Sequence, residues 1–122
     1  MPVVDEPGGG ADAVIDALIG YSLDGAPRPP FDDLVQRIDA ADATTVSVDV
    51  PSGVDADTGE GLQPHVAADH TVTLALPFQG FQESEAVEAV RVADISVPPQ
   101  VYDRFGIDAR GVFETGSLVR YR

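Results

Sequence analysis

Two short segments, one mostly apolar and one rich in β-branched residues, each closed by a chain-breaking residue, constrain the fold of this chain more than any other feature. Residues 13–19 read AVIDALI and end at Gly20, and residues 44–50 read TTVSVDV and end at Pro51. The first segment is short and lacks polar alternation, which is typical of a strand that is buried on both faces, as in a parallel sheet. The second is rich in β-branched residues, which favour strands. We therefore predict that both segments are strands of such a sheet.

A helical pattern lies between the two runs. Apolar residues recur at i, i+3, i+4 and i+7 from Phe31 to Ile38, after two prolines that suit a helix entry. Strand, helix and strand in this order form a βαβ unit, whose right-handed crossover places both strands in one parallel, helix-covered sheet. Further strands are predicted over residues 71–76 and within 87–95, and a short helix over residues 100–105.

The helices are too few for the sheet. A parallel sheet needs cover on both faces, and only one long helix is predicted. We expect an α/β fold of the three-layer, Rossmann-like class, with a mostly parallel sheet flanked by helices and an N-terminal βα portion lacking. Residues 1–12, with two prolines and three consecutive glycines, are predicted to be a flexible lead-in to a domain formed by residues 13–122.

Composition excludes several classes of function. The chain carries 21 Asp and Glu against seven basic residues, all of them Arg, for a formal charge of −14. Such a surface opposes nucleic-acid binding, and the absence of Lys and Cys rules out a P-loop, a disulfide scaffold and a thiol nucleophile. No apolar run approaches the roughly 18–20 residues of a membrane span. The acidic excess favours a protein adapted to the salt-rich cytoplasm of a halophile.

Two acidic residues mark the ends of the first two strands. Asp16 lies inside an apolar run, where an unpaired carboxylate is costly, and Asp49 lies just before Pro51 and Ser52. Because ligands collect at the carboxyl ends of parallel strands, we expect both acids to face one crevice. Carboxylate, hydroxyl and carbonyl oxygens there would suit a hard cation. The alternative is that Asp16 caps a neighbouring loop and Asp49 bonds its own turn.

The residues around these acids resemble a known family. The segments VIDALIGYSL (14–23), GAPR (25–28) and VDVPSGVD (48–55), with TVTLALP (71–77) and VADISVPP (92–99), closely resemble the YjeF N-terminal domain family, which includes the NAD(P)H-hydrate epimerases. The resemblance covers about the C-terminal half of that domain. It implies an isomerase that interconverts the R and S epimers of hydrated NADH and NADPH in cofactor repair.

The resemblance also implies roles for individual residues. It places a potassium ion on Asp16 and Ser52 and assigns the contact with the hydrated nicotinamide, and hence catalysis, to Asp49. The loop that would line the dinucleotide consists of Gly20, Tyr21, Ser22, Leu23, Asp24, Gly25 and Ala26.

The chain also departs from the family pattern. The family's Asn-Asn-Gly-Gly-Asp phosphate loop does not precede residue 12, and Phe78 follows Pro77 where the family usually has a nearby Lys. We expect the front half, or an NAD(P)H-hydrate dehydratase domain, to be a partner. An uncovered sheet face and edge also predict a homodimer. The alternative function is a non-catalytic dimerisation or ligand-sensing module.

Overall fold

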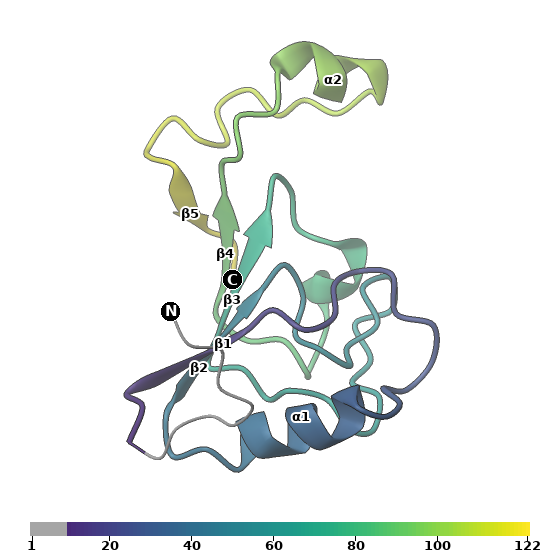
Figure 1. Cartoon of the computed structure of the whole chain (residues 1–122). Helices are drawn as coiled ribbons and strands as arrows, with labels where there is room; N and C mark the ends of the chain where they lie inside the picture. Colours follow the sequence, from purple (N-terminus) through teal and green to yellow (C-terminus); the bar gives the residue numbers. More distant parts are fainter. Residues whose placement is uncertain (1–9) are drawn as a thin grey trace.

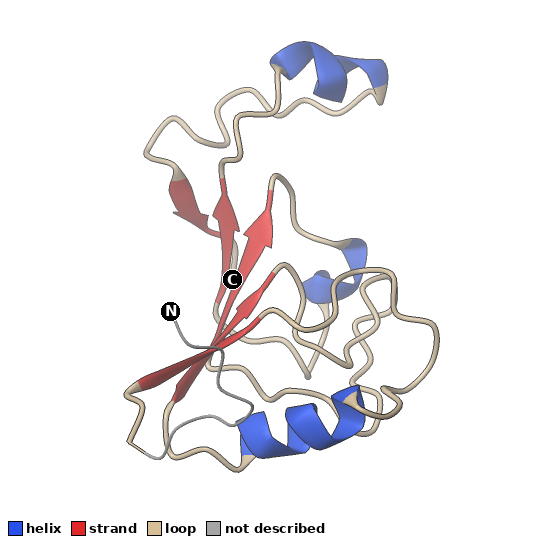
Figure 2. Cartoon of the chain, in the orientation of Figure 1, coloured by secondary structure: helices blue, strands red, loops and turns tan. Residues whose placement is uncertain are grey.

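A twisted, mostly parallel sheet forms the centre of the computed structural model, which describes residues 10–122 (Figures 1 and 2). The five strands of these residues lie side by side in chain order. Four are parallel, and the last pairs antiparallel with the fourth. In order they are β1 (Ala13–Asp16), β2 (Thr44–Val48), β3 (His70–Leu74), β4 (Val90–Ala93) and β5 (Leu118–Arg120). The predicted α/β class is confirmed, and the predicted lead-in falls mostly outside the described residues.

The long helix forms where the apolar spacing predicts it. Helix α1 (Phe31–Asp39) begins with Asp32 and Asp33 in its first turn, where the helix dipole favours anions. It turns Val35 and Ile38 into the core. A short 3₁₀ helix, η1 (Gln79–Gln82), lies on the same side of the sheet as α1, and α2 (Pro99–Arg104) extends beyond the carboxyl end of β4 (Figure 1). The predicted helix over residues 100–105 is thus confirmed to within one residue.

One face of the sheet carries the core. Successive strand residues point to opposite faces, and the register brings Asp16, Ser47 and Thr71 together on the buried face. Two apolar clusters cover that face. One consists of Val50, Val54, Ala56, Phe81, Val87 and Val90, and the other of Val35, Ile38 and Val66.

The opposite face is open over the described residues, and this corrects the prediction for the first strand. Ile15 is 63% exposed, and Leu74 and Leu118 are exposed as well. Strand β1 also ends at Asp16 rather than at residue 19 and is an edge strand, so it is not buried on both faces. The shortage of helices anticipated from the sequence therefore corresponds to one uncovered face (Figure 2).

Within residues 10–122, no helix is long and apolar enough to cross a membrane.

Candidate functional site

The second and third strands end in the same unusual turn. Val50 N–H donates to Val48 O at 3.0 Å across Asp49, whose φ is +73°, and Leu76 N–H donates to Leu74 O at 2.8 Å across Ala75, whose φ is +65°. A γ-turn with positive φ at a non-glycine residue is strained by about 1–3 kcal/mol. Such strain is typical of functional sites, and here it is located at the acid that the sequence analysis singles out.

The Asp49 carboxylate is available for chemistry. The side chain is half-buried, and no donor among residues 10–122 bonds its oxygens. A Cβ added at Gly20 would lie 3.9 Å from Asp49 Oδ2, an ordinary van der Waals separation, so the first loop passes beside the acid. The alternative in which Asp49 bonds its own turn is not what the described residues show. A partly desolvated carboxylate without a donor can accept and return a proton.

Asp16, in contrast, is fully buried and surrounded by donors. Ser47 Oγ–H donates to Oδ2 at 2.6 Å, and Ser52 donates from its N–H to Oδ2 at 2.8 Å and from its hydroxyl to Oδ1 at 2.6 Å. Leu18 N–H adds a longer bond to Oδ1 at 3.4 Å. Four donors match the approximately four lone-pair sites of a carboxylate. The loop-capping alternative therefore describes this residue correctly.

The partners of Asp16 lie on both sides of Asp49 in the sequence. Ser47 precedes the acid by two positions and Ser52 follows it by three, so Asp16 holds both flanks of the strained turn. The hydroxyl oxygen of Ser52 also accepts a hydrogen bond from Ile19 N–H at 3.0 Å, which joins the first loop to the second. Asp16 thus lies beneath the site while Asp49 reaches its surface, and the two acids do not line one open crevice.

Ser47 is the partner that the sequence analysis missed. It stands between Val46 and Val48 in an otherwise ordinary strand, and its role follows from its register opposite Asp16. A hydroxyl at an inward position, two residues before an acid at a strand end, is the signal that could have indicated it.

The loop predicted to line a dinucleotide forms an open rim. Its residues, from Gly20 to Ala26, are exposed except for the half-buried Leu23. None of their N–H groups donates to an acceptor within the described part of the chain. Unpaired backbone N–H groups beside a glycine can bind an anion, so the rim is chemically suited to a phosphate-bearing ligand.

The acidic loop after the second strand has a structural explanation. Asp55 accepts hydrogen bonds from the N–H groups of Asp57 at 2.9 Å and Thr58 at 2.8 Å. The bond from Thr58, with a smaller contribution from Asp57, lowers the pKa of Asp55. Residues 10–122 contain no group of three or more His, Asp or Glu side chains able to hold a metal ion.

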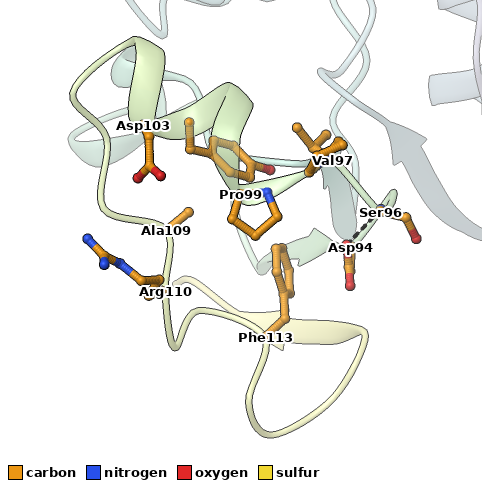
Figure 3. A pocket seen from close by; sticks show the side chains of 10 residues that line it. Asp94, Ser96, Val97, Pro99, Asp103, Ala109, Arg110 and Phe113 are labelled. Atoms are coloured by element: carbon orange, nitrogen blue, oxygen red, sulfur yellow. Dashed lines mark hydrogen bonds between the residues drawn. The ribbon is translucent and has the colours of Figure 1, made fainter.

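A cavity of about 410 Å³ lies farther along the same end of the sheet, between α2 and residues 109–113 (Figure 3). Its walls include Tyr102 and Phe113, and two of its lining residues are acids, Asp94 and Asp103. Asp94 Oδ1 accepts from Ser96 N–H at 2.7 Å, and Arg110 Nε donates to Asp108 at 3.0 Å, which lowers the pKa of Asp108. This cavity therefore offers ring contacts and one exposed carboxylate, that of Asp103, which accepts no hydrogen bond from the described residues.

The profile of the family described as "YjeF-related protein N-terminus" matches residues 3–80. This chain belongs to that family. It is 43% identical over 120 residues to an NAD(P)H-hydrate epimerase of Dehalogenimonas lykanthroporepellens, covering 98% of this chain and 48% of the relative. It is 42% identical over 91 residues to a bifunctional NAD(P)H-hydrate repair enzyme of Hyperthermus butylicus, covering 74% and 17% respectively.

A solved structure supports the same fold. The crystal structure of a yeast protein superposes with a TM-score of 0.74 at 26% identity, over 90% of this chain and 46% of the yeast chain. The chain thus spans about half the length of the epimerase and of the yeast protein that it matches.

Proposed function

We propose that this chain belongs to an NAD(P)H-hydrate epimerase and supplies the acid–base residue of the reaction. Membership of the family and the names of its relatives support the substrate class. The observation that carries the assignment within this chain is the unpartnered carboxylate of Asp49 on a strained turn beside Gly20. The exposed loop of residues 20–26 would hold the dinucleotide.

One carboxylate is sufficient for the proposed chemistry. Asp49 accepts the hydroxyl proton of the hydrated ring, the C–O bond becomes a carbonyl, and the ring C–N bond breaks. The protonated Asp49 returns the proton to the ring nitrogen. Rotation of the aldehyde and reclosure on its other face give the second epimer, so atoms and charge balance without a redox partner.

Asp49→Asn tests this role. The amide cannot accept the proton, so we expect epimer interconversion, followed by chromatography after subtraction of the uncatalysed rate, to fall by about 100-fold or more. Asp42→Asn, which removes one exposed charge away from the turn, is the matched control. Full turnover in the Asp49→Asn variant would refute the assignment. A wild-type chain that binds the hydrate without turnover would favour the non-catalytic ligand-sensing module instead.

A potassium ion is proposed at the buried network. Asp16 is a fully buried carboxylate that accepts bonds from the hydroxyls of Ser47 and Ser52 and from two backbone N–H groups. Ile19 O lies 3.5 Å from Ser52 Oγ, and carboxylate, hydroxyl and carbonyl oxygens are the ligands that hard cations prefer. Asp16 and Ser52 would hold the ion once the rotatable serine hydroxyls turn their lone pairs toward it. The ion would supply positive charge near an anionic ligand. Greater thermal stability in KCl than in NaCl at equal concentration is the expected result, and identical melting temperatures would contradict it.

Adaptation to high salt is proposed from the charge of −14. Mutual repulsion of the acidic side chains is screened as salt rises, because the Debye length falls to about 3 Å at 1 M. We expect the melting temperature to increase between low and molar KCl, as for a protein of a salt-rich cytoplasm. An unchanged melting temperature would contradict the proposal.

A homodimer is proposed through the open face of the sheet. Its apolar residues include Ile15, Leu74 and Leu118, and its strand positions carry Arg91 and Arg120 but no carboxylate, unlike the rest of this acidic chain. Leu74→Glu should shift sedimentation from dimer to monomer, whereas Phe105→Glu on the distal segment should not. A monomeric wild-type chain would overturn this proposal.

An NAD(P)H-hydrate dehydratase is the proposed consumer of the epimerised hydrate, in keeping with the bifunctional relatives.

A further inference from the structure

Three aromatic rings form a series that runs from the core to the rim of the site. Phe81 is fully buried, and its ring meets that of Phe78 edge-on, with centroids 5.4 Å apart and planes at 68°. Phe78 is half-buried and stacks on Tyr21, with centroids 6.3 Å apart and planes at 27°. Tyr21 is 71% exposed. The series therefore supports an exposed ring from beneath, through segments that are far apart in the chain.

The loop that carries the exposed ring passes beside Asp49. Tyr21 directly follows Gly20, whose position lies within 3.9 Å of Asp49 Oδ2 once a Cβ is added. The ring contact with Phe78 joins the loop after β1 to the loop after β3, and Asp49 lies on the intervening strand end. A flat ligand ring lying against Tyr21 would thus have the Asp49 carboxylate close by.

Stacking also suits the charge of this chain. A dinucleotide is anionic, the chain carries −14 and no Lys, and salt weakens exposed charge pairs. Contact between a nucleotide base and an aromatic ring is worth about 1–3 kcal/mol and depends little on ionic strength compared with phosphate contacts.

We propose that Tyr21, supported by Phe78, is a stacking platform for a planar heterocyclic ring of the bound dinucleotide and provides binding that persists at high salt. This inference rests on the proposed function and deepens it: it gives Tyr21, a residue of the dinucleotide loop, a stacking contact, and it adds Phe78, which has no role in the proton transfer. The ring could belong to the adenine or the nicotinamide half, and the experiment distinguishes the two.

The test is calorimetric titration of the full chain with NADH, AMP and reduced nicotinamide mononucleotide, at 0.1 M and 2 M KCl. Tyr21→Leu, which keeps apolar volume but removes the ring, should weaken NADH binding by about 10- to 100-fold at both salt concentrations. Tyr21→Phe should restore it. Phe78→Leu should weaken binding by a smaller factor, and the mononucleotide whose affinity falls with Tyr21→Leu identifies the stacked ring.

The controls separate this proposal from the proposed function. Phe105→Leu removes an equally exposed ring from the distal segment and should leave affinity unchanged. Unaltered NADH affinity in Tyr21→Leu would overturn the platform while leaving the epimerase assignment intact. Loss of turnover in Asp49→Asn with undiminished binding would support the epimerase assignment, and weaker binding in Tyr21→Leu is the separate result that supports the platform. A wild-type chain that binds none of the three nucleotides would overturn the platform together with the dinucleotide site.

Discussion

Replacing Asp16 by Asn should destabilise the fold by about 3 kcal/mol. The Asn oxygen can keep the bonds from Ser47 Oγ and Ser52 N–H, but its amide NH₂ then faces the Ser52 hydroxyl and Leu18 N–H, which are also donors. Two hydrogen bonds to a charged acceptor are lost, and each contributes about 1.5–3 kcal/mol to the stability. Part of this loss is offset, because a buried charge is removed and because the Ser52 hydroxyl can rotate toward Ile19 O. A loss of this size is a large fraction of the about 5–15 kcal/mol that stabilises a typical domain.

Urea unfolding followed by circular dichroism in NaCl measures this loss, since the chain has no Trp to report by fluorescence. Asp42→Asn is the control for charge removal at an exposed position. A double-mutant cycle with Ser52→Ala should show a coupling of about 1–3 kcal/mol between the two residues. A destabilisation below about 1 kcal/mol in Asp16→Asn, or one equal to that of the control, would refute the reasoning that these donors depend on the carboxylate.

Two further predictions concern the same region. Gly53→Ala should lower the free energy of unfolding by more than about 3 kcal/mol, because Gly53 has a φ of +92° and an added Cβ would collide with Pro64 O and lie 2.6 Å from His65 Cα. Gly25→Ala, where φ is +77° but the space around the residue is open, should lower the free energy of unfolding by only about 1–2 kcal/mol. Equal losses for the two variants in chemical unfolding would contradict the steric argument. Thr71→Val should stabilise the chain by about 1 kcal/mol, because its buried Oγ1 has no partner among the described residues. Thr73→Val, which removes the bond from Thr73 Oγ1 to Leu76 O, should instead destabilise it, and a melting temperature lowered in both variants would contradict this prediction.

The local elements could be predicted from sequence because their signals are local. The i, i+3, i+4, i+7 spacing located α1, and the β-branched run before Pro51 located β2. The sequence could also show that Asp16 must find donors inside an apolar strand. Which donors it finds depends on the register that sets Asp16 beside Ser47, and that pairing is not encoded in either segment alone.

The features that were not predicted arise from tertiary arrangement. Strand β5 spans only Leu118–Arg120 and exists through its antiparallel pairing with β4, so its own residues carry little signal. The exposure of Ile15 follows from the edge position of β1 and from the open face of the sheet over the described residues. The positive φ of Asp49 follows from the γ-turn, for which the neighbouring Val50 and Pro51 give no warning.

The two acids of the site have different and dependent tasks. Asp49 adopts a strained conformation, and strain persists only where the surroundings hold it from both sides. On one side Asp49 N–H donates to Val72 O at 2.8 Å, and on both flanks Ser47 and Ser52 are bonded to Asp16. Loss of the Asp16 bonds is therefore expected to loosen the turn that holds Asp49. We therefore propose that Asp16 is a positioning residue for Asp49, acting through Ser47 and Ser52.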